Sequence, residues 1–375
     1  LHLSLRRQRQ MCIRDRSRPE VEVHVVWLGL DPSGHSTQQC LNGVYYHCIH
    51  TSLSSWRIPI VGRFLERKAF SGIRDLLAEV QPDIIHIHGT ERSYTRLKTD
   101  FGVTIPTVVS IQGLLRPYSR YVYGGCSPLA MLPYLRLRDL VRGLPVLRMR
   151  SQLLSRGKGE AASLSSAAGV LGRTHWDRAH LWAVAPDARY YHVDELLRPQ
   201  FFHSLWNGAS GRLVIYTTAR SSLLKGLHTL LEALSILRVD YPDIELRIGA
   251  NIVAGAEAKF LQSLLSKFDL SRNVTYLGWL DEGQIVEELQ GATMFVSPSF
   301  IENSSNALCE AALMGVPVVA TDVGGTSSLI THNVSGLLVR AGEPEVMAWA
   351  MRRIIRSPEL AGKLGDAARK DALLR

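Results

Sequence analysis

The chain has 375 residues, of which 46% are hydrophobic and 21% charged, and its formal net charge is +9. These values are ordinary for a soluble globular protein, and the length predicts two or three domains. No run of about 18 uninterrupted apolar residues occurs, which argues against a membrane-spanning helix, and no apolar core of a secretory signal is visible. The five cysteines have no metal-type spacing and predict reduced thiols in a cytoplasmic protein.

The charge is unevenly distributed along the chain. Residues 1–200 carry 27 Lys and Arg against 16 Asp and Glu, whereas residues 201–375 carry 16 against 18. A basic half predicts an anionic partner, but no zinc-finger, helix-turn-helix or aromatic RNA-binding pattern is present, so we expect no nucleic acid. Residues 116–158 interleave nine Arg and Lys with Leu, Met and Tyr and hold one Asp. This region fits a surface in peripheral contact with a membrane and a solvated basic face equally well.

Residues 1–16 contain five arginines and show neither helical nor strand periodicity. The piece MCIRDR resembles the translation of sequencing-adapter DNA at the edge of a metagenomic contig. We therefore expect residues 1–16 to be non-native and the chain to be a fragment, in preference to a natural basic arm that binds phosphate or lipid.

From Val21 onwards, predicted strands and helices alternate. In the first half, strands are expected at 21–30, 44–49, 83–88, 106–111, 169–174 and 188–193, and helices at 62–80 and over most of 128–168. Residues 194–211 lack a regular period and end in turn residues, which predicts a domain linker. In the second half, strands are expected at 213–219, 244–249, 274–278, 293–298 and 317–321, with helices such as 225–238 between them. This alternation predicts an α/β fold with two Rossmann-like, doubly wound parallel sheets facing a cleft.

Two acids, Glu302 and Glu310, bracket the start of a helix expected near Ser304–Asn306. A helix start presents unpaired N–H groups that suit a phosphate, and a carboxylate can accept bonds from ribose hydroxyls. The layout therefore fits a nucleotide, and on spacing alone it fits a capped helix with two solvated acids equally well.

Arg220 and Lys225 follow the first strand of the second half, and Gly226 begins the next helix. Two cations at a strand exit can bind a diphosphate. An ordinary basic loop is the alternative, but both cations belong to the same crevice as Glu302, which favours the diphosphate.

Residues 209–350 resemble the donor-binding domain of the family 4 retaining glycosyltransferases, which have the GT-B fold. The resemblance rests on motifs in a fixed order, namely R-x4-K-G at 220–226, LGWL at 277–280, FVSPS at 295–299, E-x7-E at 302–310, GVPVVATDVGG at 315–325 and SGLLV at 335–339. Weaker similarity at 82–89, 108–114 and 172–180 extends it to roughly 20–375. It implies an acceptor-side N-terminal domain, 17–200, and a C-terminal nucleotide-sugar-binding domain, 209–375.

The resemblance also implies a role for each matching residue. Arg220 and Lys225 would bind the donor diphosphate, and Glu302 would contact the transferred sugar. The other expected nucleotide-binding positions are Glu310 for the ribose, the backbone N–H groups of Asn306, Ala307 and Leu308 for the phosphates, and Gly278 and Trp279 for the base. Stabilising the leaving group matters more to such a transfer than a strong nucleophile does, which suits two cations and a helix start.

The chain departs from the family pattern at four positions. Asn303 and Ser305 stand where glycines are common, and because Asn tolerates positive-φ turns we expect the loop to survive. Ser328 stands where many members have an acid. Gln112 stands where many have a His, which puts any His-dependent role there in doubt.

His86, His88 and Glu91 form another candidate cluster, for which a metal site is the less favoured interpretation. His86 and His88 alternate on a predicted strand near Glu91, but no further ligand is spaced to join them, and a strand-end His pair near the acceptor cleft is favoured. The chain has no D-x-D pair of the metal-dependent class. We therefore expect no metal and no cofactor. Trp176 and Asp177 are expected to staple a helix rather than shape the acceptor side.

We predict a hexosyltransferase-like enzyme that moves a sugar from a UDP- or GDP-sugar to a glycan or lipid-linked acceptor with retention of configuration. It would be cytoplasmic, or peripheral at the inner face of the membrane. The alternatives are an inactive nucleotide-sugar-binding fragment and a GT-B epimerase or phosphorylase. Since only residues 1–20 precede the first predicted strand, we expect the N-terminal domain to lack its first strand and helix.

Overall fold

The computed structural model describes residues 20–30, 37–51, 59–91, 97–135, 137, 145–208, 211–252 and 254–375. The expectations for residues 1–16 lie outside this part of the chain. The described residues fall into two compact units, the first within 1–87, 92–108 and 166–168 and the second within 88–91, 109–165 and 169–375. The units do not follow chain order as the predicted domains 17–200 and 209–375 do, and those domain limits stay a prediction.

The first unit contains a three-stranded sheet of order β1-β3-β2, covered by one long helix. Its elements are β1 (Val23–Leu30), β2 (Thr37–Leu41), β3 (Val44–Thr51) and α2 (Pro59–Val80). β1 pairs with β3 in parallel, whereas β2 pairs with β3 antiparallel through a turn at Asn42 and Gly43, both at positive φ. The strands predicted at 21–30 and 44–49 and the helix at 62–80 are confirmed, and β2 is an additional strand.

Short strands form a second sheet, of order β4-β5-β6-β7. They are β4 (Ile85–His88), β5 (Thr107–Ser110), β6 (Gly169–Gly172) and β7 (Tyr190–His192). Each lies inside a predicted strand, and β6 and β7 pair in parallel. Val109, Ile111 and Val170 are almost fully buried, as the apolar runs of these strands predict.

Short helices surround this sheet. They are α3 (Leu97–Phe101), α4 (Leu115–Tyr118), α6 (Pro145–Arg156), α7 (Glu160–Ser166), α8 (His175–Val184) and the 3₁₀ turns η2 (Pro128–Tyr134) and η3 (Gly157–Gly159). The described residues of 128–168 are mostly helical, as predicted, with 3₁₀ turns where Pro133 removes a helical N–H inside η2 and where two glycines lie in η3. The segment 194–211, expected to be irregular, contains α9 (Pro199–His203).

The largest sheet has six strands in the order β10-β9-β8-β11-β12-β13, with every described pairing parallel. The strands are β8 (Val214–Thr217), β9 (Glu245–Ile248), β10 (Val274–Tyr276), β11 (Met294–Ser297), β12 (Val318–Thr321) and β13 (Leu337–Val339). Its helices and turns are η4 (Leu223–Lys225), α10 (Leu227–Arg238), α11 (Ala256–Lys267), α12 (Glu282–Gly291), α13 (Asn306–Leu313), η5 (Thr326–Ser328), α14 (Pro344–Arg356) and α15 (Pro358–Leu373).

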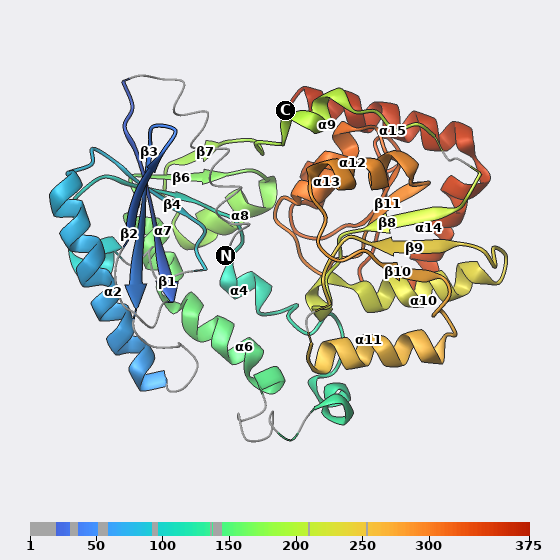
Figure 1. Cartoon of the computed structure of the whole chain (residues 1–375), viewed down its shortest axis with the longest axis horizontal. Helices are drawn as coiled ribbons and strands as arrows, with labels where there is room; N and C mark the ends of the chain where they lie inside the picture. Colours follow the sequence, from blue (N-terminus) through green and yellow to red (C-terminus); the bar gives the residue numbers. More distant parts are fainter. Residues whose placement is uncertain are drawn as a thin grey trace. The chain divides into compact units, whose positions relative to one another are not determined.

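Helices cover both faces of the six-stranded sheet (Figure 1). Ile215, Met294 and Val296 point into a core with α10, α11 and α14, whereas Tyr216 and Phe295 point into a second core with α9, α12 and α13. Alternate residues of one strand thus serve opposite faces, as a strand's period of two requires. The predicted α/β class with a doubly wound parallel sheet is confirmed.

The strand order reverses at β8. From this first strand, β9 and β10 continue to one side, while β11, β12 and β13 lie on the other. In open α/β sheets, ligands bind at such a switch point, at the carboxyl ends of the strands. Among the helices of the described residues, none is long and apolar enough to cross a membrane.

Candidate functional site

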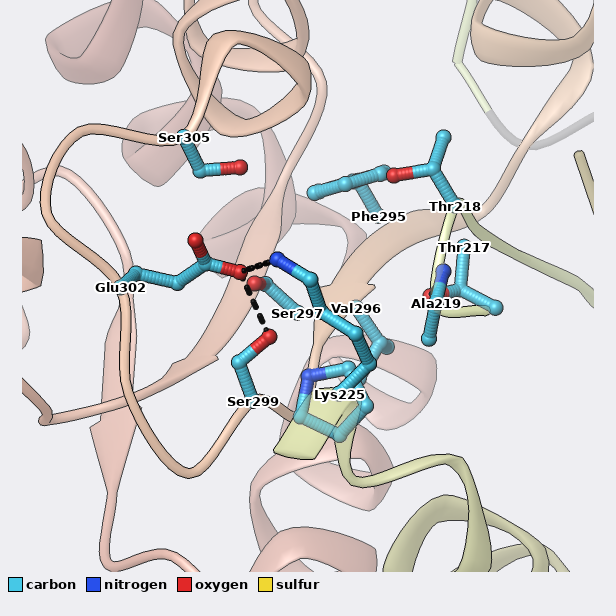
Figure 2. A pocket seen from close by; sticks show the side chains of 11 residues that line it. Thr217, Thr218, Ala219, Lys225, Phe295, Val296, Ser297, Ser299, Glu302 and Ser305 are labelled. Carbon is cyan, nitrogen blue, oxygen red and sulfur yellow. Dashed lines mark hydrogen bonds and ion pairs between the residues drawn. The ribbon is translucent and has the colours of Figure 1, made fainter. Parts of the chain in front are cut away.

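A pocket of about 270 Å³, open to solvent, lies at the carboxyl ends of β8 and β11 (Figure 2). We name it the β8–β11 pocket. It is lined by Thr217, Thr218, Ala219, Lys225, Phe295, Val296, Ser297, Pro298, Ser299, Glu302 and Ser305. Two of these residues, Lys225 and Glu302, belong to the predicted site, and Ser305 lies at the predicted helix start. The pocket therefore lies where the switch point predicts a ligand.

Lys225 and Glu302 point toward each other across this pocket (Figure 2). The Lys225 Nζ atom donates to Glu302 Oε1 at 2.5 Å, and the Ser299 hydroxyl donates to the same oxygen at 2.7 Å. The lysine side chain is 33% exposed and the glutamate side chain 14%, so solvent reaches the pair. The cation expected on a diphosphate and the acid expected on a sugar thus form an ion pair.

Two glycines bring the loops around the pocket together. A Cβ atom on Gly226, which has φ +70°, would collide with the Pro298 carbonyl oxygen. One on Gly324, at φ +56°, would collide with the Glu302 carbonyl oxygen. Only glycine fits both the backbone angle and the close approach. These contacts hold the Lys225 turn and the 324–325 turn against the loop between β11 and α13.

The start of α13 faces the same pocket through Ser305, its N-cap residue. The first intrahelical bond runs from the Cys309 N–H to the Ser305 carbonyl oxygen, at 2.9 Å. The N–H groups of Asn306, Ala307 and Leu308 precede it and have no intrahelical acceptor. The helix thus begins where the sequence predicted it, with its partially positive end beside the Lys225–Glu302 pair.

Glu310 lies on the second turn of α13 and is 4% exposed. Arg198, the N-cap residue of α9, donates from Nε to Glu310 Oε1 at 2.9 Å and from Nη2 to Oε2 at 2.8 Å. Such a two-pronged pair compensates a buried carboxylate. Sequence reasoning had singled out Glu310 but not Arg198, which lies in the segment interpreted as a linker.

The remaining predicted residues lie outside the lining of the β8–β11 pocket. Arg220 follows the end of β8 and is exposed. Gly278, at φ +74°, and the half-exposed Trp279 follow β10. The structure therefore gathers Lys225, Glu302 and the start of α13 around one pocket.

Asn303 is a buried hydrogen-bond hub that the sequence interpretation missed. It is 1% exposed, and its amide donates to the Ile111 carbonyl oxygen at 3.2 Å and to Asp177 Oδ2 at 2.9 Å. Its own oxygen accepts from the Thr174 hydroxyl at 2.7 Å. The expectation that Asn303 serves a positive-φ turn is wrong, because its backbone is not among the positive-φ positions.

Asp177 is the fully buried partner of this hub. It accepts from the Arg173 N–H at 2.8 Å and from the Tyr190 hydroxyl at 2.9 Å, in addition to Asn303. Its place in the first turn of α8 agrees with the helix-stapling role expected for it. The 302–305 loop is therefore tied to both β5 and α8.

Tyr118 lies against the same loop. The Asn303 N–H hydrogen-bonds to the Tyr118 hydroxyl, and burial, followed by the carboxylates of Glu302 and Glu91, raises the tyrosine pKa well above its ordinary value. The hydroxyl therefore stays protonated and can donate near Glu302. No periodic or motif signal in the sequence pointed to this tyrosine.

Two of the departures from the family pattern make specific contacts. Arg173 donates from Nη1 to Gln112 Oε1 at 3.2 Å and pairs with Glu195 at 2.9 Å. Ser328 Oγ accepts from the His175 N–H at 3.1 Å. Within the described part of the chain, no three His, Cys, Asp or Glu residues form a metal-binding group.

Residues 204–371 match the family model described as Glycosyl transferases group 1. The matched segment makes up less than half of the chain. D-inositol 3-phosphate glycosyltransferase of Streptomyces griseus is 30% identical over 162 residues, which cover 42% of this chain and 34% of that protein. D-rhamnosyltransferase WbpZ of Pseudomonas aeruginosa is 33% identical over 150 residues, 38% of this chain and 36% of its own length. The chain thus matches about a third of the length of these curated relatives.

Two solved structures show the same fold as this chain. Sucrose-phosphate synthase of Thermosynechococcus elongatus aligns with a TM-score of 0.74 and 19% identity over 98% of this chain and 88% of its own. Anabaena HepE, solved in complex with UDP, aligns with a TM-score of 0.61 and 17% identity over 89% and 83%. The α/β fold with parallel sheets therefore matches that of the GT-B glycosyltransferases.

Proposed function

We propose that the protein is a glycosyltransferase that takes its sugar from a nucleotide sugar. The observation that carries this proposal is the β8–β11 pocket at the sheet's switch point, where a lysine, a glutamate and the start of α13 converge. A diphosphate needs cations and N–H donors, and a sugar needs a carboxylate acceptor. The match to the group 1 family model and the relatives named as glycosyltransferases support the same reaction class.

In this proposal, the Lys225–Glu302 pair opens when the donor binds. The diphosphate takes the Lys225 ammonium, together with Arg220 and the N–H groups of 306–308. Glu302 loses its cation and becomes an acceptor for a hydroxyl of the transferred sugar. Glu310 accepts from the ribose, and Gly278 and Trp279 lie beside the base.

In the proposed reaction, the site stabilises the negative charge that develops on the diphosphate leaving group. The bond between the anomeric carbon and the diphosphate breaks, and its electron pair stays on the diphosphate. Cations and helix N–H groups that bind this leaving group stabilise the charge as it develops. The oxygen of an acceptor hydroxyl then bonds to the anomeric carbon, and its proton passes to the departing diphosphate oxygen. We propose that this occurs with retention of configuration, without a metal or a cofactor.

The donor and acceptor classes are part of the proposal. A UDP- or GDP-sugar fits the site, and structures of HepE with UDP and with UDP and glucose belong to the same fold. A glycan or a lipid-linked glycan is the proposed acceptor. We also propose a cytoplasmic protein that contacts a membrane peripherally through 116–158, because exposed Leu129 and Leu132 lie in the same region as exposed Arg148 and Arg150.

One set of variants tests the proposal. Calorimetry with UDP and GDP measures affinity, and nucleoside diphosphate release from their hexose conjugates measures turnover. Lys225→Ala should weaken diphosphate binding about ten- to a hundredfold, since charge-assisted contacts contribute ~1.5–3 kcal/mol. Lys363→Ala is the matched control, because that lysine is exposed on α15 and pairs with Glu359. Unchanged affinity of the Lys225→Ala protein for both nucleotides would contradict the proposal.

Substitutions of Glu302 and Glu310 should have different effects on nucleotide binding and turnover in the same experiment. Glu302→Gln should reduce turnover while leaving UDP affinity equal or higher, because Lys225 is released for the diphosphate. Glu310→Gln should weaken UDP binding itself. The assignment is wrong if Glu302→Gln abolishes nucleotide binding while Glu310→Gln leaves it intact.

A further inference from the structure

Arg198 is a cation of the site that no motif assigns. Its guanidinium contacts both oxygens of Glu310 through Nε and Nη2, at 2.9 and 2.8 Å. The arginine side chain is 21% exposed and the glutamate side chain 6%. The fork therefore fixes the plane of the carboxylate as well as compensating its charge.

Two neighbouring residues further constrain the Arg198 side of this bidentate contact, which we call the Arg198–Glu310 fork. Pro199 follows at the first position of α9 and restricts the backbone of Arg198, which is extended at φ −74° and ψ 141°. The guanidinium also lies over the ring of Phe201, with 4.4 Å between its carbon and the ring centroid. Phe201 is fully buried. An arginine constrained in this way loses little conformational freedom when its partner binds a ligand.

The residues on either side of Arg198 share an apolar cluster with the residues that flank the predicted base-binding positions. Leu197 and Phe201 pack in the same apolar cluster as Leu277 and Leu280, which flank Gly278 and Trp279. Leu308 of α13 belongs to this cluster too. One apolar cluster thus connects the residues beside Arg198 with those beside the predicted base-binding positions and with α13.

We propose that Arg198 is a positioning residue for nucleotide recognition: its fork holds the Glu310 carboxylate in the orientation that accepts the ribose hydroxyls. This inference rests on the proposed function of the site. Lysine would supply the charge but, as a point charge with one ammonium, it would not fix the carboxylate plane.

The test compares nucleotides that differ only in the ribose. Affinities of UDP, GDP and their 2′-deoxy and 3′-deoxy forms are measured by calorimetry for the wild type, Arg198→Lys, Arg198→Met and Glu310→Gln, and thermal stability is measured alongside. Arg352→Met is the matched control, because Arg352 makes a similar contact from Nε and Nη2 to Asp240, on the surface of α14.

We expect the wild type to prefer the ribonucleotide about tenfold. Arg198→Lys should keep most of the thermal stability but bring the ribose preference close to one, and Arg352→Met should keep the preference. If Arg198→Met fails to fold, Arg198→Lys decides alone, since it retains the charge. A wild-type ribose preference that survives in Arg198→Lys overturns the inference and leaves the proposed function standing. Failure of the wild type to bind UDP or GDP would instead contradict the proposed function.

Discussion

His228 stands on α10 directly behind the Lys225–Gly226 turn. Its Nε2 lies 2.9 Å from the Gly124 carbonyl oxygen, and its ring stacks on Phe300 at 5.4 Å between centroids. The other ring nitrogen, Nδ1, is buried and has no hydrogen-bond partner among the described residues. A neutral imidazole satisfies this environment, because protonation would bury an unpaired N–H and a charge.

We expect His228 to make stability depend on pH. Burial lowers its pKa below the ordinary value of 6.5, and the contact with Gly124 opposes this only in part. The unfolded chain therefore binds more protons below pH 6.5, so the free energy of unfolding falls as the pH is lowered from 7 through the folded-state pKa. Each unit of pKa depression contributes up to about 1.4 kcal/mol.

The measurement is denaturant unfolding between pH 7.5 and 5. His228→Gln keeps a donor for Gly124 and cannot titrate, so its stability should fall less over this range than that of the wild type. His47 and His180, whose pKa values burial also lowers, remain in both proteins and cancel in the comparison. Parallel pH profiles for the two proteins would show that His228 is not the group responsible.

Among individual residues, the sequence predicted the acids and cations of the site but not the more distant residues that bind them. Lys225 and Glu302 were both identified, because each belongs to a local motif. Arg198 and Asp177 were not assigned to the site, since their contacts with Glu310 and Asn303 join residues more than a hundred positions apart. No local period or spacing reports such pairs.

The element that positions the site is the turn between β8 and α10. η4 ends at Lys225, and Gly226 follows in the left-handed region as the N-cap of α10. Its N–H donates to the Leu223 carbonyl oxygen at 3.0 Å, and its α-carbon packs against the Pro298 carbonyl. The turn can therefore hold Lys225 beside Glu302 only if residue 226 has no side chain.

Gly226→Ala should consequently damage both stability and nucleotide binding. The new methyl group meets backbone, not a flexible side chain, so the turn must move, at a cost of about 1–3 kcal/mol. UDP affinity should fall by at least as much as it does in Lys225→Ala. Gly362→Ala is the control, since Gly362 lies in α15 with open space around its α-carbon, and helix propensity favours alanine there. Equal stability and UDP affinity of Gly226→Ala and wild type would refute this account of the turn.

Elements with a strong hydrophobic period could be predicted from the sequence. Turns that depend on single proline, glycine or asparagine residues were not predicted. The leucine stripe of α10 and the apolar runs of β8, β11 and β12 gave their positions within a few residues. The 3₁₀ turns within 128–168 have visible signals in Pro133, Gly157 and Gly159. The hairpin of β2 and β3 was missed although Asn42-Gly43 is a common two-residue turn.

At the scale of the whole molecule, alternation of strands and helices was enough to predict a parallel α/β protein. The division into compact units was beyond the sequence, because it depends on which distant segments pack together. In the first unit, Val44 and Tyr46 form a small buried cluster with Val23, Val25 and Trp27. The six-stranded sheet of the second is covered on both faces by large cores.

We therefore expect the two units to respond differently to a nucleotide. The β8–β11 pocket is built only from residues of the second unit, so UDP at about a hundredfold its Kd should add ~2.7 kcal/mol to the stability of that unit. Hydrogen exchange read by mass spectrometry can separate the units: amides of β8, β11 and β12 should exchange more slowly with UDP, whereas those of β3 should be unchanged. The Lys225→Ala protein is the control and should show a smaller effect at the same UDP concentration. Equal slowing in β3 and β12 would mean that the nucleotide stabilises both units together, and the idea of separate responses would fail.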